Sequence, residues 1–143
     1  TNVTGYFLCC REAVKRMSHR HGGKGGAIVN VSSAASRLGA PGEYVDYAAS
    51  KGAVKMLTRG MCVELAEYNI QVNGIAPGYF ATELTAALVN DRDFSAWLYQ
   101  RTQAARWGKP EELIGAAVYL ASPAANFVNG HLLFVDGGML AAV

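Results

Sequence analysis

The sequence predicts an α/β fold in which parallel strands are joined by helical crossovers. Three short apolar segments, at residues 27–31, 69–75 and 131–135, have the composition and the turn-forming boundaries of buried strands. They alternate with segments in which apolar residues recur every three or four positions, as they do in helices. Alternation of helices and strands is typical of layered α/β domains, because each crossover returns the chain to the same strand direction.

The first helix is indicated by one apolar stripe near the start of the sequence. Its members recur at spacings of four and three residues: Val3, Phe7, Cys10, Val14 and Met17. A glycine-rich loop at residues 21–26 follows and leads into the first strand. A phosphate-binding loop would instead follow a strand and open a helix, so we interpret this segment as a surface loop.

The second helix is predicted at residues 44–67 and carries two apolar stripes. One consists of Ala49, Ala53, Met56, Gly60 and Val63, and the other of Val54, Leu57, Met61 and Leu65. A helix that is apolar on two sides has to be covered on two sides. We expect one stripe to pack on the sheet and the other to pack on a helix or on another subunit.

The second half of the sequence has less regular signals. Residues 82–103 form an ambiguous helical stretch with aromatic side chains that we expect to be exposed. Pro110 opens a further helix, with Glu111 and Glu112 in the first turn, where the helix dipole favours acids. This helix is predicted to end near Ser122, before the third strand.

The composition favours a single globular domain. The 143 residues are 51% hydrophobic and 17% charged, with a net charge of +2. This balance gives no support for a nucleic-acid-binding surface, and no apolar run is long enough to cross a membrane. The three cysteines show neither metal-ligand spacing nor a disulfide pattern, so we expect free thiols, no metal site and a cytoplasmic protein. The first residues run directly into a helical pattern, and we expect the sequence to begin inside a domain.

The main chemical signal is the pair Tyr47 and Lys51. The two residues are four positions apart on the second predicted helix, so their side chains share one face. A free tyrosine has a pKa of about 10 and is a poor base, but a neighbouring lysine cation stabilises the phenolate. The pair could then donate or accept a proton near neutral pH. Taken alone, this spacing is more often a surface helix pair, so the context has to decide.

Two strand ends supply that context. Ser33 follows the first predicted strand, and Pro77 and Gly78 follow the second. Ligands of open parallel sheets bind beyond the carboxyl ends of the strands. The Ser33 hydroxyl could therefore face Tyr47, although a serine in this position also commonly starts a turn.

In order and spacing, these motifs resemble those of the short-chain dehydrogenase/reductase family. The matching segments are NVTGYF at residues 2–7, VNVSS at 29–33, YAASK at 47–51, VNGIAPGYFAT at 72–82 and VDGG at 135–138. The resemblance covers essentially the whole chain. It implies the C-terminal half of a doubly wound, Rossmann-type parallel sheet in three layers. Residues 1–143 would then be part of one domain whose glycine-rich N-terminal half is absent from the sequence.

The parts of the sequence before and after the start of the second predicted helix resemble different branches of this family. From about residue 51 onward the sequence resembles the gluconate 5-dehydrogenase branch of the family, as in residues 74–80 and 104–108. Residues 1 to about 50 resemble another, less characterised branch, most clearly at residues 32–47. The sequence therefore resembles two branches of one family.

The resemblance also implies roles for individual residues. Tyr47 would be the general acid in reduction and the general base in oxidation, while Lys51 would lower its pKa and hold the nicotinamide ribose. Ser33 would hydrogen-bond the substrate oxygen, and Asn2 would help to hold a water that relays protons. The nicotinamide would be lined by Pro77, Gly78, Phe80 and Thr82.

The implied activity is the interconversion of a secondary alcohol and a ketone with NADP or NAD, most directly gluconate and 5-ketogluconate. An alternative is another sugar, polyol or small carbonyl compound, which the loop before Tyr47 favours. A different alternative is an inactive fragment or assembly module, if the molecule starts at Thr1. Four arginines could bind a substrate carboxylate, although each is more often structural: Arg37, Arg92, Arg101 and Arg106.

The resemblance further implies assembly and motion. It implies a homodimer or homotetramer, in which the first and second helices each bury one face against another subunit. Residues 82–103 resemble the mobile lid that covers the substrate in this family.

Overall fold

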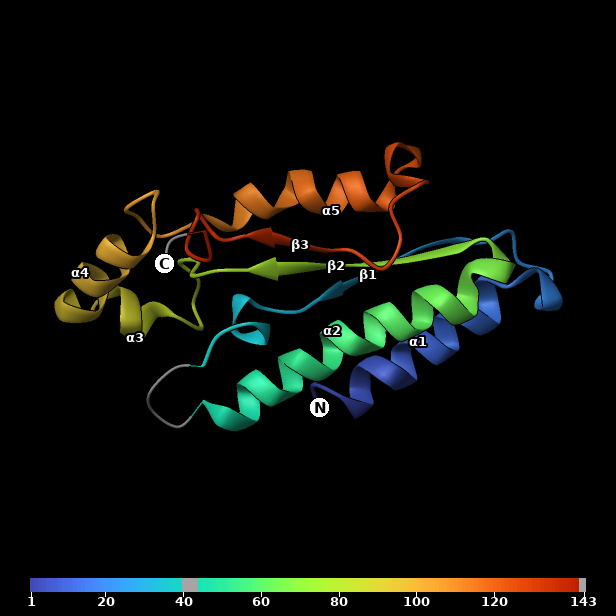
Figure 1. Cartoon of the computed structure of the whole chain (residues 1–143), viewed down its shortest axis with the longest axis horizontal. Helices are drawn as coiled ribbons and strands as arrows, with labels where there is room; N and C mark the ends of the chain where they lie inside the picture. Colours follow the sequence, from blue (N-terminus) through green and yellow to red (C-terminus); the bar gives the residue numbers. More distant parts are fainter. Residues whose placement is uncertain (40–43, 142–143) are drawn as a thin grey trace.

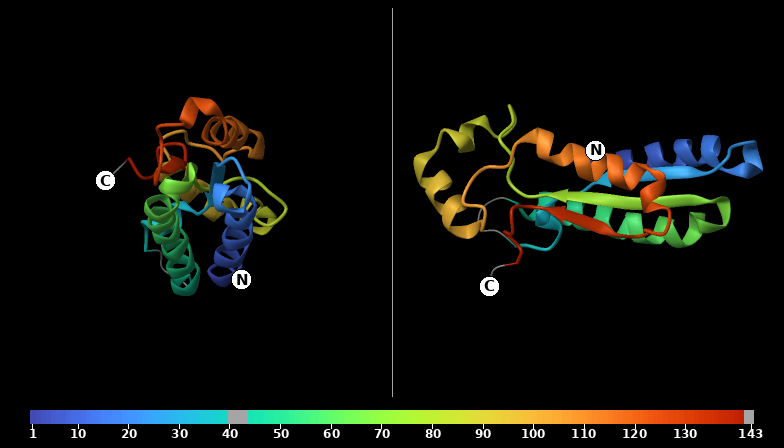
Figure 2. Two further views of the ribbon diagram at one scale, coloured as in Figure 1. Left: turned by 90° about the vertical axis from the view of Figure 1, so that its right-hand side faces the viewer. Right: turned by 90° about the horizontal axis from the view of Figure 1, so that it is seen from above.

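In residues 1–39 and 44–141, which the computed structural model describes, a three-stranded parallel sheet lies between two layers of helices (Figure 1). The strands are β1 (Gly26–Val31), β2 (Ile70–Pro77) and β3 (Leu132–Val135), in that spatial order. Helices α1 (Thr4–Met17) and α2 (Val45–Leu65) lie on one face, and α5 (Ile114–Ala121) lies on the other (Figure 2). The predicted three-layer α/β fold is confirmed.

The central strand β2 organises the core. It pairs with β1 from Gly26↔Ile70 to Val31↔Ile75. On its other side Pro77 is still in register with Val135, so β2 continues two residues beyond the predicted end. The core divides around this strand, since Ile70 and Val72 pack toward α2 and Ile75 packs toward α5.

Helix α2 uses only one of its two apolar stripes within this chain. Val54 is fully buried and Leu65 is 8% exposed, so the second stripe packs on the sheet. Met56 and Val63, on the first stripe, are 59% and 78% exposed. The described residues therefore leave the outer side of α2 without the cover that the sequence predicts.

Helix α1 is joined to the sheet and to α2 by a short buried polar chain. The Cys10 thiol donates to Asn30 Oδ1 at 3.5 Å, and Asn30 Nδ2 donates to Thr58 Oγ1 at 3.0 Å. Burial raises the pKa of the Cys10 thiol. The predicted apolar stripe of α1 is only partly covered, because Phe7 remains 53% exposed while Cys10 is buried.

The less regular segments differ from the expected elements in detail. The stretch at residues 82–103 forms two helices, α3 (Ala86–Val89) and α4 (Arg92–Arg101), because the Asp91 carboxylate caps the start of α4. The helix predicted from Pro110 opens with a 3₁₀ turn before α5 begins. The predicted loop at residues 32–43 contains a 3₁₀ turn, Ala34–Ser36, and its residues 40–43 lie outside the described part of the chain.

A buried asparagine attaches the segment before β3 to β2. Asn73 is fully buried, its Nδ2 donates to the Val128 carbonyl at 2.7 Å, and its Oδ1 accepts from the His131 N–H at 3.0 Å. This side chain replaces ladder hydrogen bonds where the chain enters the last strand. The side chain therefore fixes where β3 starts.

Replacement of this asparagine should be costly. We expect Asn73→Ala to lower the free energy of unfolding by about 1–3 kcal/mol, because two backbone groups lose their partner. Urea-induced unfolding measures the change. Asn126→Ala is the control, since Asn126 is exposed. Equal losses in the two variants would show that the Asn73 hydrogen bonds contribute nothing specific.

Candidate active site

The predicted site residues gather where β1 and β2 end. Because Val31 is paired with Ile75, Ser33 and Pro77 each lie two residues beyond the same rung of the ladder. Gly78 packs directly on the end of β3, and a Cβ added to it would come within 2.8 Å of the Asp136 Cα. Only glycine allows the turn after β2 to approach this closely.

Lys51 reaches this edge from the first half of α2. Its side chain is 9% exposed in the folded chain, and its ammonium donates to the Val31 carbonyl at 3.0 Å. The same carbonyl accepts the hydroxyl of Tyr6 at 2.7 Å. The ammonium lies 5.7 Å from the ring centroid of Tyr47 and also 5.7 Å from that of Tyr6. Burial lowers the pKa of Lys51 and raises the pKa of Tyr6.

Tyr47 and Asn2 are linked through Ser50. Tyr47 is 40% exposed and so remains open to a ligand. Its carbonyl accepts the Ser50 hydroxyl at 2.7 Å, and Ser50 Oγ accepts from Asn2 Nδ2 at 3.3 Å. The start of the chain is thereby held against the turn of α2 that carries Tyr47 and Lys51.

Ser33 has a structural task in addition to its predicted chemical one. Its Oγ accepts from the Ala35 N–H at 3.1 Å and caps the 3₁₀ turn, while its own hydroxyl proton remains available. The neighbouring Ser32 donates to the Lys51 carbonyl at 2.9 Å, which ties the end of β1 to α2. In the described part of the chain no hydrogen bond joins the hydroxyls of Ser33 and Tyr47. Their convergence on one substrate oxygen stays a prediction.

Among the residues expected to line the nicotinamide, Phe80 presents a backbone group and Thr82 presents a side chain. The Phe80 side chain is 9% exposed and packs on Gly108, so its ring is part of the interior. Among the described residues nothing accepts the Phe80 backbone N–H, which is therefore free to bind a ligand. Thr82 is exposed, and its hydroxyl lies 3.0 Å from that of Thr85. Backbone N–H and threonine hydroxyl are both suited to a carboxamide.

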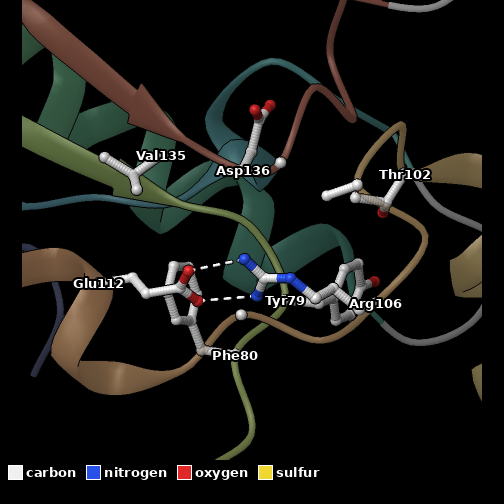
Figure 3. A pocket seen from close by; sticks show the side chains of 10 residues that line it. Tyr79, Phe80, Thr102, Arg106, Glu112, Val135 and Asp136 are labelled. Carbon is white, nitrogen blue, oxygen red and sulfur yellow. Dashed lines mark hydrogen bonds and ion pairs between the residues drawn. The ribbon is translucent and has the colours of Figure 1, made fainter.

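A pocket of about 300 Å³ lies beside this turn (Figure 3). Its lining includes Tyr79, Phe80, Thr102, Arg106, Glu112 and Asp136, and none of the residues predicted to be catalytic. Figure 3 shows the Arg106 guanidinium paired with the Glu112 carboxylate, at 2.6 and 2.8 Å. Because this carboxylate already neutralises its charge, Arg106 is a poor candidate for a substrate carboxylate. A second candidate, Arg37, lies over the Phe134 ring at 5.4 Å.

The contribution of the Arg106–Glu112 pair to the stability of the fold should depend on pH. The hydrogen bond from Arg106 lowers the pKa of Glu112 from 4.5 to about 2. A carboxylate with a lowered folded-state pKa stabilises the fold above its ordinary pKa, and this stabilisation is lost as pH falls through the folded value. Glu112→Gln should therefore lower the Tm near neutral pH, and the difference from wild type should shrink between pH 4.5 and about 2. Thermal unfolding at a series of pH values tests this, with Glu111→Gln as control. A Tm difference that does not change with pH would contradict it.

The sequence did not single out one feature of the site, a cluster of aromatic rings around Tyr79. Tyr79 follows the Pro77–Gly78 turn, and its ring contacts Phe94, Trp97 and Trp107. The tyrosine after Pro-Gly was visible in the sequence, but the contact between residues so far apart was not. Phe94, expected to be exposed, is half-buried in this cluster.

Residues 1–39 and 44–141 contain no group of three or more His, Cys, Asp or Glu side chains arranged to hold a metal ion. None of their helices has the length and hydropathy needed to span a membrane.

Comparison with known proteins gives close matches over nearly the whole chain. The family model described as enoyl-(acyl carrier protein) reductase matches residues 1–140. The 5-keto-D-gluconate 5-reductase of Escherichia coli K12 is 63% identical over 142 residues, covering 99% of this chain and 54% of that protein. The uncharacterized oxidoreductase YgfF of the same strain is 54% identical over 142 residues, covering 96% and 56%. The chain thus spans about half the length of the curated relatives it matches.

A solved structure gives the same result. The gluconate 5-dehydrogenase of Burkholderia cenocepacia J2315, in complex with NADP and tartrate, superposes with a TM-score of 0.94 and 52% identity over 99% of this chain and 54% of that one. The alignments to both branches run through residue 51. Because each identity is an average over its whole alignment, the division of the sequence near this residue stays a prediction.

Proposed function

Since the chain belongs to the short-chain dehydrogenase/reductase family, we propose that the protein of which it is part transfers hydride between NADP or NAD and a secondary alcohol or ketone. The observation that carries the proposal is the buried ammonium of Lys51 beside Tyr47, at the carboxyl end of the sheet. Gluconate and 5-ketogluconate are the proposed substrate pair, supported by the names of a relative with 63% sequence identity and of a solved structure with a TM-score of 0.94. Residues 1–143 would form the C-terminal portion of one dinucleotide-binding domain.

In the proposed mechanism, named side chains transfer the proton of the substrate alcohol and stabilise charge on the reacting oxygen. In oxidation Tyr47 accepts the proton of the substrate alcohol, and in reduction it returns that proton to the new alkoxide. Lys51 stabilises the Tyr47 phenolate through its positive charge. Ser33 donates its remaining hydroxyl proton to the substrate oxygen and stabilises charge there. Asn2, which donates to Ser50, would help to hold a water that relays protons between Lys51 and solvent.

The residues present fit the nicotinamide side of a dinucleotide. The cofactor supplies the hydride donor or acceptor. The Lys51 ammonium donates one N–H to the Val31 carbonyl, and its other two N–H groups can donate to ribose hydroxyls. The unpaired N–H of Phe80 and the hydroxyl of Thr82 can bind a carboxamide, and Pro77 and Gly78 shape the turn beside it.

A related substrate is the second candidate. The 2-dehydro-3-deoxy-D-gluconate 5-dehydrogenase of Dickeya dadantii is 48% identical over 140 residues of this chain. The name of this relative supports another sugar, polyol or small carbonyl compound as the substrate of the same chemistry.

We also propose that the protein is a cytoplasmic homodimer or homotetramer. The support for assembly is the exposed apolar side of α2, with Val45 at 78%, Met56 at 59% and Val63 at 78% exposure, and of α1, with Phe7 at 53%. The three free cysteines fit a reducing compartment. Sedimentation velocity measures the assembly, and a monomer at micromolar concentration would contradict it.

The function is tested by assaying the whole protein with gluconate and 5-ketogluconate, each with NADP(H) and NAD(H). Formation or loss of the reduced cofactor, followed by its absorbance, reports turnover. Turnover of other polyols with gluconate inert would favour the second candidate. Absence of turnover with any polyol or ketone would overturn the proposal.

A further inference from the structure

Tyr79 stands at the junction between the catalytic edge of the sheet and the segment that carries α3 and α4. It is the first residue after the Pro77–Gly78 turn. Its carbonyl accepts the Gly108 N–H at 2.9 Å, and the Gly108 carbonyl accepts the Ala81 N–H at 2.9 Å. The backbone on both sides of Phe80 is therefore fixed before any ligand binds.

The Tyr79 ring is held by three other aromatic rings. Its centroid lies 5.5 Å from Phe94, 5.9 Å from Trp97 and 5.8 Å from Trp107, all in edge-on geometry. The cluster is itself anchored, because Trp107 Nε1 donates to Ser95 Oγ at 3.1 Å. Contacts of this kind favour one ring orientation. The position of the Tyr79 hydroxyl is consequently set by the cluster.

The hydroxyl of this fixed ring is available, and the residue directly follows the turn at the catalytic edge of the sheet. Within residues 1–39 and 44–141 no group forms a hydrogen bond with the Tyr79 hydroxyl. Burial raises the pKa of Tyr79, so the hydroxyl stays protonated and can donate a hydrogen bond near neutral pH. An orientated, unpaired hydroxyl at the edge of a substrate site can discriminate between ligands. A ligand that forms no hydrogen bond with this hydroxyl buries it without a partner, which costs binding free energy.

Resting on the proposed function, we propose that the Tyr79 hydroxyl determines specificity by hydrogen-bonding a hydroxyl group of the polyhydroxy substrate other than the one that reacts at Tyr47. A phenol both donates and accepts, as a sugar hydroxyl does. The aromatic cluster would then couple the position of α4 to substrate binding, because Phe94 and Trp97 are both on α4.

Tyr79→Phe in the whole protein tests this, because it removes the hydroxyl and keeps the ring in its cluster. We expect KM for 5-ketogluconate and Kd for gluconate to rise about tenfold to a hundredfold. The Kd is measured by calorimetry on the NADPH-saturated enzyme, because gluconate cannot accept hydride and this complex does not react. Kd for NADP, the pH profile and Tm should not change. Tyr99→Phe, which alters an exposed tyrosine on α4, is the matched control and should leave all of these values unchanged.

The outcomes separate this inference from the proposed function. Unchanged gluconate binding in Tyr79→Phe overturns the role of the hydroxyl, as does a loss that follows a fall in Tm. If wild type turns over a different polyhydroxy ketone, the proposed substrate is wrong, and Tyr79 is judged by the same comparison on that ketone. Wild-type enzyme with no activity on any polyhydroxy compound overturns both.

Discussion

Tyr47→Phe should reduce kcat by at least about a hundredfold, and up to about ten-thousandfold, in the whole protein. General acid–base groups contribute in this range, and the substitution removes only the atom that carries the proton. Tyr47 is 40% exposed and its hydroxyl supports no hydrogen bond within the described residues, so the fold should survive. Steady-state kinetics in both directions measure the loss, and Tm with circular dichroism verifies the fold.

The matched control for this variant is Tyr119→Phe. Tyr119 is a similarly exposed tyrosine on α5, across the sheet from the site. We expect it to retain wild-type kinetics. Near-normal kcat in Tyr47→Phe would refute the proposed mechanism, whatever the family of the chain.

Lys51→Met should weaken cofactor binding and shift the pH dependence of oxidation to higher pH. The wild-type ammonium lies 5.7 Å from the Tyr47 ring centroid and favours the phenolate. Without that cation, the negative charge that forms on the phenol during oxidation has no counter-charge, so we expect oxidation to require a higher pH. Methionine keeps much of the buried volume of the lysine stem, which limits the structural cost. We expect a loss of about tenfold or more in Kd for NADP, since hydrogen bonds from a charged donor are lost.

Lys55→Met is the control for the charge on this helix. Lys55 is one turn further along α2 and touches none of the proposed site residues through a hydrogen bond. We expect Lys55→Met to match wild type in two measurements. One is the pH–rate profile of kcat/KM, and the other is the Kd for the cofactor from fluorescence titration. An unshifted profile in Lys51→Met, with only Tm reduced, would mean that Lys51 is a structural residue.

Much of the fold follows from local patterns that the sequence displays. The strand at residues 27–31 and the helix with Tyr47 and Lys51 on one face are set by hydrophobic periodicity and by the turn residues around them. The Asp91 cap that divides residues 82–103 is a local signal as well, since aspartate before a helix commonly caps it. The helical character predicted for this stretch is confirmed, and the cap explains why it forms two helices.

The site was predictable to the extent that it depends on strand ends. Ser33, Pro77 and Gly78 could be placed together because parallel strands end at one edge of a sheet. The burial of the Phe80 ring against Gly108 could not be predicted, since it depends on a loop 28 positions away in the sequence (108 minus 80).

The sequence by itself determined the order of the elements, their parallel direction and the pairing of Tyr47 with Lys51 on one helical face. These depend on the helical period of 3.6 residues and on short apolar runs bounded by turn residues, which each segment carries alone. Only the tertiary structure decided which stripe of α2 faces the sheet, that Arg106 is neutralised by Glu112, and that Tyr79 is held by three rings from α4 and the following loop. Each of these is a contact between side chains that are distant or out of register in the sequence. Such contacts exist only once the packing of the whole chain has fixed where each segment lies.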